Sequence, residues 1–520
     1  MRLGRTVITA LAISAIAAGM ACAAPTKMPE RWNFVTIGLG DDASLQRLLD
    51  VLKQSKECGC THILLPDGLS YNLSENRAYL ARVQKVKRAA KQMNLTIVPS
   101  VFALGYSGRY IGGNPNLAAG LPVKDMPFVV AGKSASADPA LALDTSTLKP
   151  SAVGIDGKLK ARPFTHYRLR FVKKGKYEGD MEEMVRITTC GGKRWVSRRV
   201  PDIYEQDGKT IIETTFNTLE LTGGEMRVRI DVLAEDLKIE PAGALMIVRR
   251  GLTPLTVASA DGKTIYEEGK DFKPLADPQL TFGDGHVFWH EPPTLELTAD
   301  SRIRDGDKLS VSFFHAYRLG SDQDGISLED PQVFQLMERD IANCAKVWDA
   351  GGYFMNYDEI RIGGWENPSI KPGKLLANHI RRACALVRKH APHARLYTWS
   401  DMFCPGHNAY PFGAKGYYYL VNGNWDGSWE GLPGDVIILN WYDPDGRNIK
   451  FFADRGHSQV LCGYYDGVTT EKMKENIAVW MKVSTGAPHI LGLMYTTWEK
   501  NYKNMNEYFR ILDSYFVPSR

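Results

Sequence analysis

The stretch Tyr353-Phe354-Met355-Asn356-Tyr357-Asp358-Glu359 decides how the chain is interpreted. Its first five residues are typical of a buried β-strand, and two adjacent carboxylates close it. Gly363-Gly364-Trp365-Glu366 follows almost at once. Acidic groups at the end of a buried strand cost free energy unless they are paired or exposed in a cleft. Barrel enzymes place their chemistry at that face, so Asp358 and Glu359 are the candidate catalytic pair.

Segments with the pattern of buried strands flank this stretch, and helical patterns separate them. Three such segments precede residue 107, and five follow residue 320. Eight strands that alternate with helices predict an α/β fold, a closed (β/α)8 TIM barrel. The predicted strands are residues 33–39, 61–66, 95–101, 353–357, 396–400, 436–441, 459–463 and 490–495.

The hydrophobic period changes between the third and fourth of these strands. From about residue 107 to 320 short segments alternate in polarity, residues 245–248 and 308–314 among them, and helical patterning is absent. This pattern predicts an inserted antiparallel β-sandwich. Helical patterning resumes at Asp330, a good cap before Pro331. The predicted organisation is a leader (1–23), a first barrel part (24–106), the sandwich (107–320) and a second barrel part with the catalytic site (321–520).

The first 23 residues have the features of a secretory signal. Arg2 and Arg5 precede an apolar stretch, and small residues stand before Ala24. We therefore expect a secreted or periplasmic protein. Lipoprotein anchoring at Cys22 is the alternative, which the lack of a leucine in residues 19–21 disfavours. No later run of about 18 apolar residues occurs, so no membrane span is expected.

The composition excludes several classes of protein. With 44% hydrophobic residues, a chain of 520 residues can bury a large core. The formal charge of +5 includes the two leader arginines, so the mature chain is nearly neutral and nucleic acid is not an expected partner. Removal of the leader leaves an odd, sparse set of cysteines, which is not a disulfide framework. We expect neither a metal nor another cofactor.

The ends of the last four predicted strands carry further acidic and aromatic side chains. In a barrel they converge on one mouth. Aromatic faces stack on the apolar faces of sugar rings, and carboxylates accept hydrogen bonds from hydroxyls, so the set predicts a carbohydrate site. The alternative is that the carboxylates only pair with Arg361 and Lys500 at the rim. The predicted substrate-binding residues are Trp399, Asp401, Tyr442, Asp443, Asp466, Trp498 and Glu499.

The adjacent carboxylates suit the cleavage of a glycosidic bond. This reaction requires an acid that protonates the leaving oxygen and a group that stabilises the cationic transition state. Neighbouring side chains on a strand point in alternate directions, so only one of the two carboxyls is expected to reach the glycosidic oxygen. A nearby acid, and burial beside Trp399, would raise the pKa of the acid into its working range.

These residues also resemble a known family. Asp358-Glu359 after the fourth strand is similar to family 20 glycoside hydrolases, the β-N-acetylhexosaminidases. Residues 436–443 and 492–499 look like the family segments in which Tyr bonds the acetamido oxygen and Trp and Glu hold the sugar ring. The resemblance implies a retaining, substrate-assisted mechanism on N-acetylhexosaminides. Asp358 would orient the acetamido group that attacks the anomeric carbon, and Glu359 would be the acid/base.

Two alternatives to this interpretation remain open. One is double displacement on a sugar without an acetamido group, with Glu359 as the acid and Asp466 or Glu499 as the nucleophile. The other is a non-catalytic glycan-binding protein that uses the sandwich. The resemblance covers about residues 353–498, and the first two strands lack the sugar-binding Arg and the His-rich stretch of the family.

Overall fold

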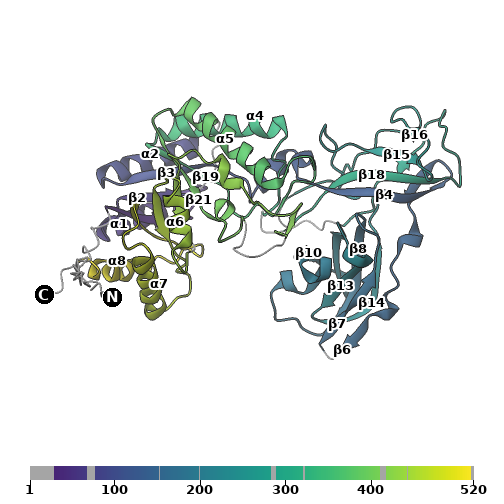
Figure 1. The fold of residues 1–520 in the computed structure, drawn as a ribbon, viewed down its shortest axis with the longest axis horizontal. Helices are drawn as coiled ribbons and strands as arrows, with labels where there is room; N and C mark the ends of the chain where they lie inside the picture. Colours follow the sequence, from purple (N-terminus) through teal and green to yellow (C-terminus); the bar gives the residue numbers. More distant parts are fainter. Residues whose placement is uncertain are drawn as a thin grey trace, which may run out of the picture.

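The computed structural model describes residues 29–66, 76–151, 153–197, 200–282, 289–319, 323–409, 417–441 and 443–516, so the predicted leader lies outside the described residues. Eight parallel strands close into a barrel in chain order, which confirms the (β/α)8 fold (Figure 1). The barrel strands are β1 Glu30–Phe34, β2 His62–Leu65, β3 Thr96–Ala103, β19 Gly352–Asn356, β21 Arg395–Trp399, β23 Ile437–Asn440, β24 Gln459–Cys462 and β25 Ile490–Tyr495.

Seven of these strands lie within two residues of the predicted bounds, and β1 is the exception. It starts three residues early and ends at Phe34, although the predicted strand ran to residue 39. Residues 35, 37 and 39 remain buried beyond the end of the strand, which is why the apolar pattern continued. Large side chains fill the barrel interior, as is usual for this fold. They include Trp32, Leu64, Val98, Phe354, Tyr397 and Leu439.

Helices follow most of the barrel strands, and side chains cap several of them. Asp330 accepts a hydrogen bond from the N–H of Gln332 (2.8 Å), which confirms the predicted helix start at Pro331. Between β21 and β23 two short 3₁₀ segments, η8 (Asp401–Phe403) and η9 (Ser428–Gly431), stand in place of a longer helix. The helices of the barrel are α1 Asp42–Glu57, α2 Arg77–Gln92, α4 Pro331–Trp348, α5 Pro372–His390, α6 Arg447–Ala453, α7 Thr470–Val483 and α8 Met505–Ser514.

The inserted segment between β3 and α4 forms a six-stranded sheet and a sandwich (Figure 1). The sheet has the order β16-β15-β18-β4-β5-β17. The sandwich lies between β5 and β15 in sequence, which confirms the predicted inserted antiparallel fold. Its sheets are β10-β9-β13-β7-β6 and β11-β12-β8-β14. The strands of the insertion are β4 Gly120–Ala131, β5 Ser134–Ala137, β6 Lys149–Ser151, β7 Gly154–Lys160, β8 His166–Lys174, β9 Val185–Thr189, β10 Arg194–Ser197, β11 Asp202–Gln206, β12 Lys209–Asn217, β13 Glu225–Ile230, β14 Leu233–Pro241, β15 Thr256–Ser259, β16 Ile265–Tyr266, β17 Leu295–Glu296 and β18 Lys308–Ala316.

Three details of the insertion differ from the sequence expectation. The predicted strand at 308–314 is β18, which pairs with β4 in the six-stranded sheet and not in the sandwich. Residues 245–248 are buried, but the first two lie in a turn and Ile247 makes only an isolated bridge with His315, because a short apolar run does not by itself distinguish a strand from another buried segment. A short helix, α3 (Gly108–Gly113), and a 3₁₀ turn, η2 (Pro115–Leu117), lie where helical patterning seemed absent.

The insertion has cores of its own, and one of them reaches the barrel. The sandwich core includes Leu169 and Val228, and it continues into Ile362, Trp365 and Leu420 of the barrel loops. The sandwich is therefore packed against the loops that follow β19 and β21.

Among the described residues, every helix is too short or too polar to cross a bilayer.

Candidate active site

Asp358 and Glu359 lie just beyond the carboxyl end of β19. Glu359 has a left-handed backbone (φ 44°), which few residues other than glycine adopt without cost. Gly105, after β3, packs against this turn so closely that a Cβ atom there would lie 1.5 Å from the carbonyl oxygen of Asp358. The N–H of Asp358 also donates to the side chain of Asn356 (3.0 Å). Contacts with Gly105 and Asn356 thus fix the backbone of the turn that carries both carboxylates.

Asp401, which follows β21, lies beside Asp358, close enough for its charge to raise the pKa of Asp358. The Asp401 side chain is fully buried, and its Oδ2 accepts from the N–H of Glu359 (3.1 Å). Burial, and then the charges of Asp401 and Glu359, raise the pKa of Asp358 well above its ordinary value. Burial also raises the pKa of Asp401 to about 7. Two neighbouring carboxyls do not ionise together easily, so the surroundings of Asp358 favour its protonated form.

The carboxylate of Glu359, unlike that of Asp358, is surrounded by hydrogen-bond donors. Its Oε2 accepts hydrogen bonds from the hydroxyl of Tyr106 (2.8 Å), the amide of Gln323 (3.0 Å) and the guanidinium of Arg361 (2.8 Å). The side chain of Glu359 is 27% exposed, whereas that of Arg361 is 9% exposed. Three donors on one oxygen, one of them a cation, suit a carboxylate that acts as an anion. Arg361 does pair with a carboxylate, as the rim alternative supposed, but this carboxylate remains accessible.

Two residues of this site, Tyr106 and Gln323, were not predicted from the sequence. Tyr106 lies shortly after β3, and the strand-end rule, had it been applied to the third strand, would have found it. No local signal marks Gln323, which reaches Glu359 only through the fold. Tyr418 is buried beside Asp401 and Glu359, and burial and those two charges raise its pKa. Within the described residues its hydroxyl has no hydrogen-bond partner, so it is a candidate donor to a substrate.

Aromatic rings form a cluster at the carboxyl ends of β21, β23, β24 and β25. Trp498 (38% exposed) and Tyr464 (51% exposed) stack with their ring centres 5.5 Å apart. The Trp498 ring lies 6.3 Å from that of Trp441 and 6.5 Å from that of Trp399. Trp399 is nearly fully buried and forms the floor of the cluster. The exposed rings supply the flat apolar surface that was expected at this mouth.

Asp466, a predicted substrate-binding residue, instead supports the loop after β25. Its two carboxylate oxygens accept from the hydroxyl of Thr497 and from the backbone N–H of Trp498, the latter at 2.6 Å. The residue is 6% exposed. Asp466 therefore fixes the position of the exposed Trp498 ring.

The remaining predicted residues have different positions. Asp443 accepts from the backbone N–H groups of Gly446 (2.8 Å) and Ile449 (2.7 Å) and so caps the first turn of α6. Glu499 is exposed. Tyr442 lies outside the described residues. The structure therefore brings Asp358, Glu359 and Asp401 together, while both oxygens of Asp443 are engaged by backbone.

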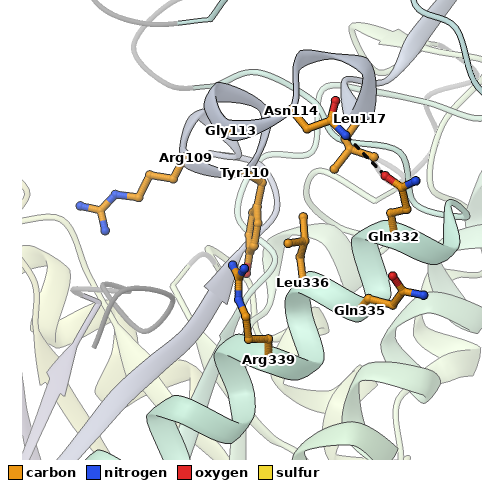
Figure 2. Close-up of a pocket in the computed structure, with 9 residues that line it drawn as sticks. All are labelled: Arg109, Tyr110, Gly113, Asn114, Leu117, Gln332, Gln335, Leu336 and Arg339. Carbon is orange, nitrogen blue, oxygen red and sulfur yellow. Dashed lines mark hydrogen bonds between the residues drawn. The ribbon is translucent and has the colours of Figure 1, made fainter. Parts of the chain in front are cut away.

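A cavity of 570 Å³ lies elsewhere, between α3, η2 and α4 (Figure 2). Its lining includes Arg109, Tyr110 and Arg339 but no carboxylate, and none of the strand-end residues. It therefore lacks the groups needed for acid or base chemistry. Among the described residues, no cluster of three or more His, Cys, Asp or Glu side chains could hold a metal ion.

Scans against protein-family models and against curated proteins find no match. Solved structures that match this chain include a rhamnosidase from Novosphingobium sp. PP1Y, with 10% sequence identity and a TM-score of 0.34 over 90% of this chain and 55% of that chain. A family 89 glycoside hydrolase from Clostridium perfringens, in complex with GlcNAc-alpha-1,4-galactose, has 11% identity and a TM-score of 0.25 over 38% of this chain and 20% of that chain. The same family in complex with PUGNAc has 12% identity and a TM-score of 0.24, over 37% and 22% of the two chains. The chain thus spans about half of the first structure and about a fifth of the others, and likenesses this distant do not assign a family.

Proposed function

We propose that the protein is a glycoside hydrolase whose active site is the mouth of the barrel. One observation carries the proposal: two adjacent, accessible carboxyls have opposite surroundings. Burial and the neighbouring Asp401 raise the pKa of Asp358 and favour its protonated form, whereas Glu359 accepts from the guanidinium of Arg361. Pairs of titratable groups whose environments differ in this way are typical of an acid and an anion that work together.

The geometry supports Asp358 as the general acid and Glu359 as the ionised group. Asp358 gives its proton to the glycosidic oxygen as the bond to the anomeric carbon breaks. Glu359 stabilises the positive charge at that carbon, or bonds to it until water releases the sugar. Water then returns a proton to Asp358. In this assignment neither Asp466 nor Glu499 is the nucleophile.

The route implied by the family 20 resemblance is the second candidate. There Glu359 donates the proton, and Asp358 orients an acetamido group of the substrate. The sequence of residues 436–443 and 492–499 supports it. The two routes differ in a measurable way, because only the second requires an N-acetyl group on the sugar.

The proposed substrate is a carbohydrate, and the proposed location is outside the cytoplasm. The exposed Trp498 and Tyr464 rings at the carboxyl ends of the barrel strands support binding of a sugar ring. The pattern of residues 1–23 supports export.

A panel of aryl glycosides tests this function. It should contain pairs of sugars with and without a 2-acetamido group, and the purified protein should hydrolyse at least one of them. Glu359→Gln should abolish that activity, while Glu475→Gln, a matched change at an exposed site on α7, should not. A protein that binds glycans but hydrolyses no member of the panel would instead fit the non-catalytic alternative.

A further inference from the structure

One buried arginine of the sandwich makes polar contacts with the active-site loops, in addition to the apolar contacts of the sandwich core. Arg194 begins β10, and its side chain is fully buried. One terminal nitrogen donates to the carbonyl of Val421 (3.2 Å), and the guanidinium lies 3.6 Å from the centre of the Tyr417 ring. The other terminal nitrogen lies 3.5 Å from the carboxylate of Glu220. A buried guanidinium is costly unless such partners surround it, so these contacts fix the loop against the sandwich.

The loop that Arg194 contacts, residues 417–421, also contacts Arg361 of the active site. β22 (Leu420–Val421) pairs in parallel with β20 (Ile362–Gly363). The first N–H of β22 donates to the carbonyl of Arg361 (3.0 Å). The guanidinium of Arg361 also lies 4.7 Å from the centre of the Tyr419 ring. Because Arg361 is the cation that donates to Glu359, residues 417–421 determine where that cation lies.

The two ends of the insertion reach the same carboxylate. Tyr106, before the insertion, and Gln323, after it, both donate to Oε2 of Glu359. Gln323 also accepts from Arg361. The two chain segments that flank the insertion therefore contact the carboxylate of Glu359 directly. The sandwich itself is connected to that carboxylate indirectly, through β22 and Arg361.

We propose that the sandwich is a working part of the active site and that Arg194 is its positioning residue. Arg194 fixes residues 417–421, these residues fix Arg361, and Arg361 fixes the carboxylate of Glu359. This inference rests on the proposed function for the catalytic meaning of Glu359. The physical link from Arg194 to Arg361 stands apart from it.

Two substitutions of Arg194 and one matched control test the inference. Arg194→Met keeps much of the volume but removes the donors, whereas Arg194→Lys keeps the charge without the planar fork. The control is Arg227→Met on β13 of the same five-stranded sheet, where the side chain is 57% exposed and pairs with Asp156. The measurements are backbone hydrogen exchange in residues 418–422, together with kcat and KM on the best glycoside of the panel.

In Arg194→Met the amides of residues 420 and 422, which donate to Arg361 and Gly363, should exchange faster. We expect kcat to fall by up to about 10²-fold with a smaller change in KM, because the loss is one of positioning. Arg194→Lys should recover part of both effects, and Arg227→Met should match the wild type.

Unchanged exchange in residues 418–422 of Arg194→Met would overturn the inference, whatever the activity. Faster exchange with unaltered kcat would overturn the link to Glu359. If Arg194→Met does not fold, the same two measurements on Arg194→Lys decide. A wild-type protein that hydrolyses no glycoside would refute the proposed function, and the exchange data would still decide whether the sandwich holds the loop.

Discussion

Two edges of the barrel mouth carry carboxylates at strand ends, yet their partners differ. Beyond β19, Asp358 and Glu359 are held by side chains and remain accessible. Beyond β23 and β24, Asp443 and Asp466 accept hydrogen bonds from backbone N–H groups and are buried. An acid with side-chain partners can exchange protons and meet a substrate, while one engaged by backbone supports the loop. All four carboxylates follow strand ends, so the two edges differ in the groups that contact the carboxylates and not in their position.

The largest expected effect comes from Glu359→Gln. This substitution removes the charge that faces Arg361, and kcat should fall by about 10³-fold or more. Steady-state kinetics on the best aryl glycoside measure the loss, and circular dichroism checks that the variant is folded. A variant with more than a tenth of the wild-type kcat would remove Glu359 from the catalytic centre.

The next effect distinguishes the two assignments of the acid. Asp358→Asn should lower kcat/KM by roughly 10²–10⁴ on substrates with poor leaving groups and much less on substrates with very good ones. This dependence follows because a good leaving group does not need the proton. If Glu359→Gln shows the dependence on the leaving group instead, the family 20 assignment is correct and ours is wrong.

Asp401→Asn should change the response to pH. Its pKa of about 7 lies above the ordinary value of 3.8, so the native state binds a proton more tightly than the unfolded chain does. Stability from this group is therefore fully present below about pH 4 and is lost as the pH rises through about 7. The variant should show a flatter melting temperature from pH 5 to 8. The alkaline limb of its kcat/KM profile should move to lower pH, because Asp358 loses its charged neighbour.

If the pH dependence of the melting temperature and that of kcat/KM both match those of the wild type, Asp401 does not raise the pKa of Asp358. The controls for these measurements are Glu475→Gln and the wild-type protein in the same buffers.

A smaller effect is expected at the second edge. Asp466→Ala removes both acceptor oxygens, including the one that accepts from the backbone N–H of Trp498. Since one hydrogen bond is worth about 1 kcal/mol, KM should rise by roughly 3- to 10-fold while kcat stays nearly constant. A kcat loss as large as that of Glu359→Gln would make Asp466 a candidate nucleophile again.

The smallest effect on activity is expected for Asp443→Ala. The loss of this cap should lower the free energy of unfolding by about 0.5–2 kcal/mol. Urea denaturation measures that loss, and kcat/KM should change little. A large change in KM without a change in stability would make Asp443 a candidate substrate-binding residue again.

The sequence alone was enough to predict the barrel and the place of its site. The alternation of buried strands with amphipathic helices requires a parallel sheet closed by helices, and it located seven strands closely. Strand ends of such a barrel share one face, so Asp358, Glu359 and Asp401 were expected together. The switch of period near residue 107 predicted the inserted antiparallel sandwich, because a half-buried strand has a period of two residues.

Only the tertiary structure decided what each carboxylate does. The chemistry of a carboxyl depends on its burial and on the groups that contact it, and these come from distant parts of the chain. Glu359 receives a hydrogen bond from Tyr106, which lies 253 positions earlier, while Asp401, 42 positions later, receives one from its N–H. The link from Arg194 to Val421 spans 227 positions. Local patterns report which residues are buried, but they do not report which residues meet, because packing in three dimensions brings those groups together.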